Sequence, residues 1–295
     1  MDPIVVEARR NGVVEARHTV HAVAVEDGAV VAEAGDGSLV CYLRSSSKPL
    51  QALPLARARS DLDERDLAIA SSSHRATDDQ LDAVRSLLAK APATEDELEL
   101  GLEPGRPPTK LHHNCSGKHS GMLALCRARD WDSGGYVRAG HPVQQEMLTV
   151  HAEAADVSAD EIPTAVDGCG VQTFALPLER QAFLYARFER LAGGARVAAA
   201  MRAHPDLVGG PDGPDFELMR VLPGWIAKSG AEGLICAAGP GGIGVALKTE
   251  DGAGRAHRPA LAFFLGLLGY DLAQWRSVPV SNTRKEVVGE LSVAA

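Results

Sequence analysis

Short valine-rich segments separated by tight-turn sequences make up the first part of the chain. Apolar residues cluster over residues 4–43, and the interruptions are Arg10-Asn11-Gly12, Glu26-Asp27-Gly28 and Gly35-Asp36-Gly37. An Asn or Asp followed by Gly is typical of hairpin turns, because such turns need residues that tolerate positive φ. The pattern predicts an antiparallel β meander over residues 4–43.

The middle of the chain changes to helical spacing. Thr77-Asp78-Asp79-Gln80 has the sequence of a capping box and precedes apolar residues at intervals of three and four, which predicts a helix over about 78–91. Similar patterns predict helices from 117 to about 129, from 142 to about 155 and over 257–270. Residues 92–112 and 204–215 are rich in Pro and Gly, so we expect loops there, the second a candidate lid.

Strand patterns return near the end of the chain. Residues 234–238 and 243–249 flank Gly239-Pro240-Gly241-Gly242, which predicts a second hairpin. Terminal strands of this kind can pair into one antiparallel sheet flanked by helices. We therefore expect an α/β (α+β) fold in a single domain of two lobes. The sheet lobe would comprise about 1–45 and 215–295, and the mainly helical lobe about 46–214.

Bulk properties narrow the classes of protein. The 295 residues are 45% hydrophobic and 23% charged, and the net charge of −9 argues against nucleic acid and anionic membranes as partners. No apolar segment approaches the roughly 20 residues needed to span a bilayer, and the start lacks a signal pattern, so we expect a cytoplasmic protein. Five cysteines, an odd number, argue against a disulfide framework.

Lysine is scarce in this chain and placed unusually. Seven lysines stand against 23 arginines, and three of the seven, Lys48, Lys118 and Lys228, lie beside small polar residues in short motifs. Lysine can lose its proton when buried, whereas arginine cannot. A neutral lysine beside a serine is a base beside a nucleophile, so these motifs indicate acyl transfer.

Three serine-containing motifs bear on this chemistry. Ser45-x-x-Lys48 puts both side chains on one face of a helical turn, although a Ser N-cap is an equal reading. Ser71-Ser72-Ser73-His74 is either a strand end or cap, or a second serine that relays protons. Lys228-Ser229-Gly230 is either a helix end or an active-site strand edge. Their order matches the Ser-x-x-Lys, Ser-Asp-Asn and Lys-Thr-Gly elements of penicillin-recognising enzymes.

Cysteine and histidine gather at two further places. Cys115 precedes Lys118 and His119, with His112 and His113 nearby, and Gly168-Cys169-Gly170 holds another thiol. Cys beside Gly often marks a tightly packed structural thiol. Thiolates also suit Zn²⁺, but the spacing does not fit a zinc ribbon, so both readings stay open here.

With these segments in view, the chain resembles the L-asparaginase II family of the Rhizobium type. The segments that carry the resemblance are residues 44–49, 71–74, 113–119, 167–170 and 227–233, and Asn114-Cys115-Ser116-Gly117-Lys118-His119 is the most specific. The resemblance implies a serine-β-lactamase-like fold shared with the serine glutaminases. One departure is Arg75-Ala76-Thr77, where the family commonly has a small residue, Gly and an acidic residue.

The resemblance also implies a set of site residues. The catalytic pairs would be Ser45 with Lys48 and Ser73 with Lys228, and Zn²⁺ would be held by Cys115, Lys118 and Cys169 with Asp167 and His119 behind them. We expect substrate contacts from His74, Gly230 and Ala231.

The reaction implied is hydrolysis of L-asparagine to L-aspartate and ammonia through an acyl-enzyme. Ser45 would attack, Lys48 would take the proton, and Ser73 with Lys228 would relay protons or form an alternative pair. The backbone N–H groups of Ser45 and of the strand near Ala231 would stabilise the oxyanion. Another Ser/Lys amidase, of glutaminase or penicillin-binding type, and a non-catalytic metal or amino-acid binding protein are the alternatives. We also expect a homodimer.

Overall fold

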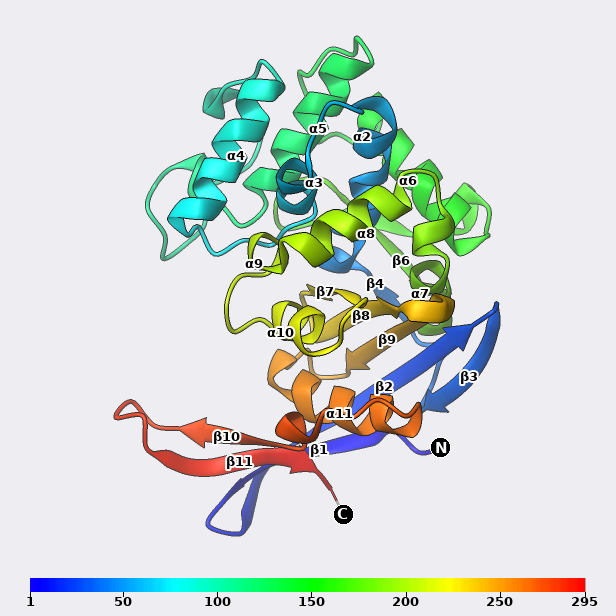
Figure 1. The fold of residues 1–295 in the computed structure, drawn as a ribbon, viewed down its shortest axis with the longest axis vertical. Helices are drawn as coiled ribbons and strands as arrows, with labels where there is room; N and C mark the ends of the chain where they lie inside the picture. The colour runs from blue at the N-terminus through cyan, green and yellow to red at the C-terminus, as the bar shows by residue number, and fades with distance from the viewer. Residues whose placement is uncertain (295) are drawn as a thin grey trace.

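Strands from both ends of the chain form one antiparallel sheet, which occupies the lower half of Figure 1. The computed structural model describes residues 1–294. The sheet has the order β10-β11-β1-β2-β9-β8-β7, and β3 pairs with β2 outside this path. Its strands are β1 (Ile4–Arg10), β2 (Val13–Glu26), β3 (Ala29–Ala34), β7 (Ile226–Gly230), β8 (Leu234–Gly239), β9 (Ile243–Thr249), β10 (Ser277–Ser281) and β11 (Val287–Val293). The first and last of these strands pair, with Val6 opposite Val293.

The predicted meander is present in β1 to β3 but ends before residue 40. The two turns take the expected positive φ, at Asn11 and Gly12 and at Asp27 and Gly28. Strand β4 (Val40–Tyr42) does not pair with β3, so the prediction of a meander up to residue 43 is wrong in its last strand. It joins a small sheet of order β4-β6-β5 with β5 (Thr164–Val166) and β6 (Gln172–Pro177), because Leu43 is buried beside β6 and donates its N–H to Phe174 O at 2.9 Å.

The helices are α1 (Lys48–Gln51), α2 (Leu53–Ala58), α3 (Glu64–Ala70), α4 (Asp78–Lys90), α5 (Ser116–Ala128), α6 (Pro142–Ala155), α7 (Leu178–Ala186), α8 (Gly194–Ala203), α9 (Pro205–Val208), α10 (Pro214–Val221) and α11 (His257–Leu267). Most of them form the upper half of Figure 1, whereas α7, α10 and α11 lie against the sheet. The predicted capping box of α4 forms between Thr77 and Gln80. The segment predicted as a loop at 204–215 contains the short helix α9, so that prediction is only partly correct.

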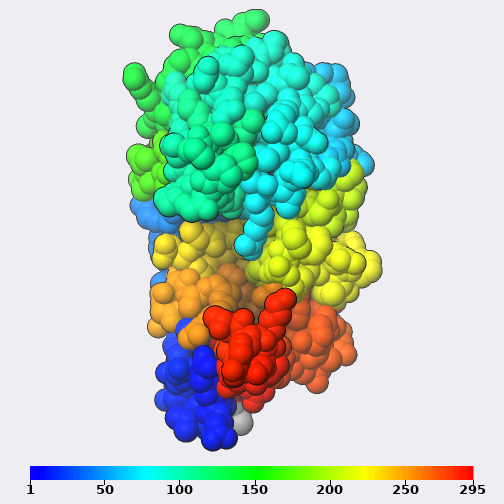
Figure 2. Space-filling view, turned by 90° about the vertical axis from the view of Figure 1, so that its left-hand side faces the viewer, coloured from blue at the N-terminus to red at the C-terminus, as the bar shows by residue number. Residues whose placement is uncertain are grey.

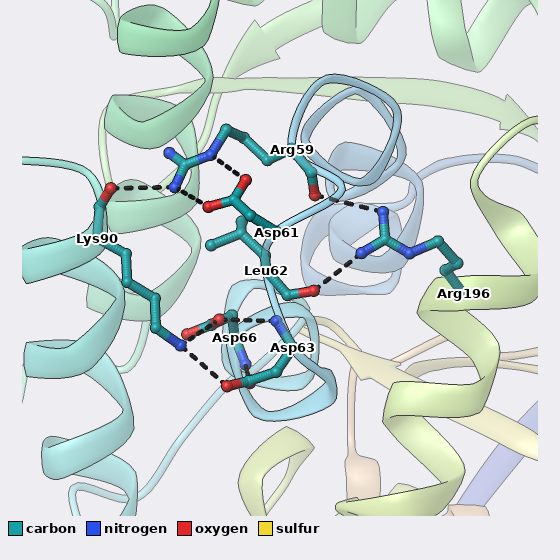
Figure 3. A network of polar contacts seen from close by, with 7 residues as sticks. All are labelled: Arg59, Asp61, Leu62, Asp63, Asp66, Lys90 and Arg196. Carbon is teal, nitrogen blue, oxygen red and sulfur yellow. Dashed lines mark hydrogen bonds and ion pairs between the residues drawn. The ribbon is translucent and has the colours of Figure 1, made fainter.

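A charged network fixes the helices that lead to the serine motif at residues 71–73 (Figure 3). Lys90 at the end of α4 contacts Asp63 at 2.9 Å and Asp66 at 2.7 Å, the two residues of the capping box that starts α3. From α8, Arg196 donates to the carbonyl of Leu62 at 2.9 Å. Helix α3 is therefore tied to α4 and α8 at its first turn, and its last turn delivers Ser71, Ser72 and Ser73.

The observed architecture confirms the predicted fold class, a mixed α/β fold with an antiparallel sheet from both chain ends. The second predicted hairpin is present as β8 and β9. Lys228 lies on the edge strand β7, which excludes the reading of a helix end. None of the helices within residues 1–294 has the length and apolar character that crossing a membrane requires.

Candidate active site

The turn that carries Ser45 begins with a strained residue. Arg44 has φ of 48°, a region that costs an L-residue other than Gly roughly 1–2 kcal/mol. Its side chain contacts Asp167 at 2.7 Å, and its N–H donates to Thr173 Oγ1 at 3.2 Å. The 3₁₀ turn η1 (Arg44–Ser47) then continues into α1, and the Lys48 N–H bonds to the Ser45 carbonyl. Ser45 and Lys48 therefore lie one turn apart, as their spacing predicts.

Lys48 is the centre of the serine–lysine arrangement. Its side chain is buried, with 1% of the residue exposed, and Nζ lies 2.9 Å from Ser73 Oγ and 2.6 Å from the Ser72 carbonyl. Burial lowers the pKa of Lys48, the thiol of Cys115 opposes this, and the charges of Lys118 and Lys228 lower it further. No carboxylate of the described residues contacts Lys48, so it is placed to be a neutral base.

Ser73 is held by backbone contacts on both sides. Its N–H donates to Val208 O at 2.8 Å, and the next N–H, of His74, donates to Asn114 O at 3.2 Å. Helix α5 can approach α3 closely because residue 117 is Gly: a Cβ there would lie 2.3 Å from Ile69 O. The close approach brings the segment from Asn114 to Lys118 next to the serine motif.

His74 is buried, and its ring is held by hydrogen bonds within the protein. It is fully buried, its Nδ1 accepts from the Ala76 N–H at 3.1 Å, and its Nε2 lies 2.8 Å from Ser116 Oγ. Ser116 Oγ in turn donates to Leu111 O at 2.9 Å. Burial lowers the pKa of His74 to about 3, so the ring is neutral and donates through Nε2. Both ring nitrogens are hydrogen-bonded within the protein. His74 lines the pocket, so the predicted contact with substrate stays a prediction.

Lys228 pairs with a carboxylate that the sequence analysis did not single out. Its Nζ lies 3.2 Å from Asp215 Oδ2 and donates to Ser229 O at 2.8 Å. The same carboxylate oxygen accepts from the Ser229 hydroxyl at 2.7 Å and from its N–H at 3.1 Å. Burial opposes the charge of Asp215, but Lys228 and the Ser229 bonds lower its pKa to about 2. The expected hydrogen-bonded pair of Ser73 and Lys228 does not form within residues 1–294; Ser73 pairs with Lys48 instead.

Asp215→Asn is expected to destabilise the fold by about 3–5 kcal/mol near neutral pH, because it leaves Lys228 charged and buried without a partner. The folded pKa is depressed, so the contribution is present above the ordinary pKa of 3.8 and is lost as pH falls through about 2. Urea unfolding of the wild type and the variant at neutral pH tests this. Asp212→Asn, at an exposed site three residues away, is the control. Equal unfolding free energies for both variants would contradict the role of the ion pair.

The edge strand β7 lies against the turn of Ser45. Ser46 Oγ donates to Lys228 O at 2.9 Å, and a Cβ on Gly230 would lie 2.8 Å from Leu43 O. Ala231 follows in an exposed turn. Strand β7 and the turn of Ser45 are therefore in direct contact. Gly230 and Ala231, the expected substrate contacts, do not line the neighbouring pocket, whose only described lining residue from this strand is Ser229.

A polar pocket of about 230 Å³ opens at this place. It lies where the helical part meets β7 and the loop before α10, and Figure 2 shows the surface hollowed between the light-blue to cyan and the yellow segments. Its walls are Ser73, His74, Arg75, Arg106, Asn114, Gly209, Gly213, Pro214, Asp215 and Ser229. The pocket thus reaches Ser73 Oγ, which Lys48 contacts from the protein interior.

The predicted zinc ligands also come together. Lys118 Nζ lies 2.9 Å from Cys169 Sγ, and all three ligand residues are buried. A hydrogen bond from Cys115, together with the charge of Lys118, holds the pKa of Cys169 far below its ordinary range. Burial disfavours the charge on Lys118, yet the thiolate of Cys169 raises its pKa. In this state the cluster is an ammonium–thiolate pair.

Of the two residues predicted next to these ligands, His119 adjoins the cluster. His119 Nδ1 contacts Tyr136 OH at 2.7 Å, while its Nε2 is buried without a hydrogen-bond partner among residues 1–294. Asp167 holds Arg44 rather than a ligand side chain. The described residues contain no group of three or more His, Cys, Asp or Glu arranged for a metal ion. Cys115, Lys118 and Cys169 nevertheless offer two thiols and one amine, and thiolates suit Zn²⁺.

Four residues that line the pocket were not predicted as site residues from the sequence. They are Asp215, Ser229, Arg106 and Asn114. Ser229 and Asn114 lie inside motifs that were singled out for their neighbours, so those motifs were the available signal. Asp215 precedes Lys228 by thirteen residues, a spacing that matches no known motif. The two side chains meet only because α10 packs beside β7.

The geometry agrees with what known proteins indicate. The model of the family described as L-asparaginase II matches residues 6–293, and the chain belongs to this family. Membership indicates a hydrolase of the serine amidohydrolase kind acting on a small molecule. A search of curated proteins gave no match.

Solved structures with similar folds are distant. EstCE1, described as a hydrolase with promiscuous acyltransferase activity, is 13% identical, with 78% of this chain and 88% of that chain covered and a TM-score of 0.43. A β-lactamase from Mycobacterium bovis is 14% identical, with 87% and 94% covered and a TM-score of 0.39.

Proposed function

We propose that the protein hydrolyses the side-chain amide of L-asparagine to L-aspartate and ammonia through an acyl-enzyme. The observation that carries this is Lys48, a buried lysine without a carboxylate partner, 2.9 Å from the hydroxyl of a serine in a polar pocket. Family membership supports an amide as the substrate.

Ser45 is the proposed nucleophile and Lys48 its base. Ser45 precedes Lys48 by one helical turn, the spacing expected of a nucleophile and its base, and Lys48 Nζ lies 2.9 Å from Ser73 Oγ. Ser45 Oγ attacks the amide carbon while Lys48 accepts its proton, and Ser73 passes that proton to the departing ammonia. Water then attacks the ester carbon, Lys48 accepts a proton from the water, and the proton returns to Ser45 Oγ as L-aspartate leaves.

Lys228 has an electrostatic part in this scheme. Its Nζ contacts the Asp215 carboxylate at 3.2 Å, and its positive charge helps to lower the pKa of Lys48. This differs from a proton relay through Lys228, because a lysine paired with a buried carboxylate is a poor base near neutral pH. The N–H groups of Ser45 and the β7 edge are the proposed oxyanion donors.

The test of this function is ammonia release from L-asparagine, L-glutamine and β-aspartyl peptides under steady-state conditions. We expect turnover of L-asparagine with the highest kcat/KM of the three substrates. Absence of ammonia release from every amide would reject the amidohydrolase, whereas a preference for glutamine would retain the chemistry and change the substrate.

We further propose that Cys115, Lys118 and Cys169 hold Zn²⁺, with His119 and Asp167 behind them. Lys118 would bind as the neutral amine, so metal would replace the ammonium–thiolate pair described above. Bound zinc would orient substrate or the two cysteine-bearing segments at its remaining position. The serine–lysine machinery is complete without it.

Cys169→Ser is expected to lower the bound zinc at least tenfold, because a thiolate is replaced by a hydroxyl of far lower affinity for the ion. Elemental analysis of purified protein measures it, and Cys41→Ser, which removes a thiol bonded to Gln181, is the control. In the wild type, chelation should raise KM more than it lowers kcat. Equal zinc in both variants would reject the ligand assignment, and loss of kcat on chelation with the fold retained would make zinc catalytic.

A further inference from the structure

Arg75 brings an unpaired positive charge to the mouth of the pocket. Its side chain is exposed and lines the same cavity as Ser73. Arg65 and Arg106 are each balanced by a carboxylate, at 2.6 Å from Asp79 and 3.3 Å from Glu103. No ion pair involves Arg75 anywhere in residues 1–294. Its charge is therefore available to a ligand.

The turn around Arg75 is held in place. Its N–H donates to Gln80 Oε1 at 2.8 Å, and the following residue, Ala76, has φ of 57° and donates to His74 Nδ1. Positive φ costs Ala roughly 1–2 kcal/mol, so the surrounding contacts impose this conformation. Gly210 lies against the stem of Arg75, where a Cβ would meet Arg75 Cγ at 2.8 Å. Arg75 is thus positioned between the serine motif and the glycine-rich loop.

Among its described lining residues the pocket has one unpaired cation, Arg75, and no free carboxylate. Asp215 is the one acidic residue among its described walls, and its oxygens accept from Lys228, Ser229 and Phe216. Close packing around that carboxylate depends on Gly209 and Gly213, where a Cβ would lie 2.5 and 2.6 Å from Asp215 Oδ1. A ligand ammonium group would therefore find no open partner, whereas a ligand carboxylate would find Arg75.

We infer that Arg75 binds a carboxylate of the substrate, so that the substrate class is linear monoamides of dicarboxylic acids, recognised by the carboxylate and not by an α-ammonium group. The inference rests on the proposed amidohydrolase. It includes L-asparagine and extends to succinamate, which keeps the amide and the carboxylate but lacks the amino group. Succinamate and water would give succinate and ammonia by the same steps.

Three amides separate the two charged groups of L-asparagine. We expect succinamate to have kcat/KM within about tenfold of L-asparagine. We expect 3-aminopropanamide, which keeps the amino group and lacks the carboxylate, to be about 10- to 100-fold poorer, as is typical for loss of a charge-assisted hydrogen bond. Equal rates for L-asparagine and 3-aminopropanamide would overturn the inference while leaving the amidohydrolase intact. Ammonia from none of the three would remove both.

Variants of Arg75 give the second arm. Arg75→Gln should lower kcat/KM for L-asparagine and succinamate about 10- to 100-fold, mainly through KM, and leave 3-aminopropanamide unchanged. Arg75→Lys should recover part of the loss, because it restores the charge without the bidentate geometry. Arg85→Gln, at an exposed residue of α4 paired with Asp82, is the matched control. An equal fall for all three amides, or no fall for succinamate, would assign Arg75 a structural role instead.

Discussion

Ser45→Ala is expected to lower kcat by about three orders of magnitude or more, because the attacking oxygen is removed and the remaining groups can only orient substrate and water. Unfolding should stay close to wild type, since the Ser45 hydroxyl makes no hydrogen bond within residues 1–294. The measurement is steady-state ammonia release, combined with mass spectrometry of enzyme quenched during turnover. An acyl adduct on the peptide containing Ser45 is the expected result.

The comparison with Ser73→Ala decides which serine attacks. Ser73 should also be important, because it is the hydroxyl in contact with Lys48, but its loss should leave the acyl adduct on Ser45 detectable. Ser46→Ala removes the adjacent hydroxyl, which bonds to Lys228 O, and should stay within about tenfold of wild type. If Ser45→Ala kept activity within that range and the adduct appeared on Ser73, the two serines would exchange roles.

Lys48→Arg should be nearly as damaging as Lys48→Met, with losses of about three orders of magnitude in kcat/KM. Arginine keeps the positive charge but does not act as a base near neutral pH. The folded pKa of Lys48 lies below its ordinary value of 10.5, and the neutral form is the active one. Activity of the wild type should therefore fall as pH decreases through that lowered pKa and reach its plateau on the alkaline side.

Stability measurements separate loss of chemistry from loss of structure. Burying a lysine costs free energy, so Lys48→Met, which is similar in length and apolar, should unfold at an equal or higher urea concentration than wild type. Lys110→Arg, at a partly exposed lysine bonded to Asp96 O, is the control for the exchange of side chains. High activity in Lys48→Arg would make Lys48 an electrostatic anchor and would require another base.

Locally encoded features were predictable from the sequence. The capping box of α4, the turns at Asn11 and Asp27, and the hairpin of β8 and β9 depend on residues within a few positions of one another. The candidate site was found through the same kind of short motif, so Ser73, Lys48 and the Cys115–Lys118 segment were recognised before their partners were known.

Contacts between distant segments were not predictable in this way. Lys48 contacts Ser73 because the segment after α3, which contains the serine motif, packs against the first turn of α1. The spacing between Ser45 and Lys48 in the sequence does not predict this contact. Strand β4 left the meander for the same reason, since its partner β6 lies more than a hundred residues later. The lysine at position 228 was recognised, but its carboxylate partner depends on how α10 packs beside β7.

The pairing of the first and last strands has a consequence for how the protein is made. Strand β1 is made before most of the sheet, but it pairs with β11, whose residues come almost 300 positions later, and β2 pairs with β9, whose residues come more than 200 positions later. At the usual speed of protein synthesis the first hairpin waits on the order of ten to fifty seconds for these partners. During that time its strand edges are unsatisfied, and the sheet can close only after β11 has been made and has left the ribosome. Folding of this protein is therefore dominated by non-local contacts, the arrangement that makes folding slow and leaves nascent chains dependent on protection of their edges.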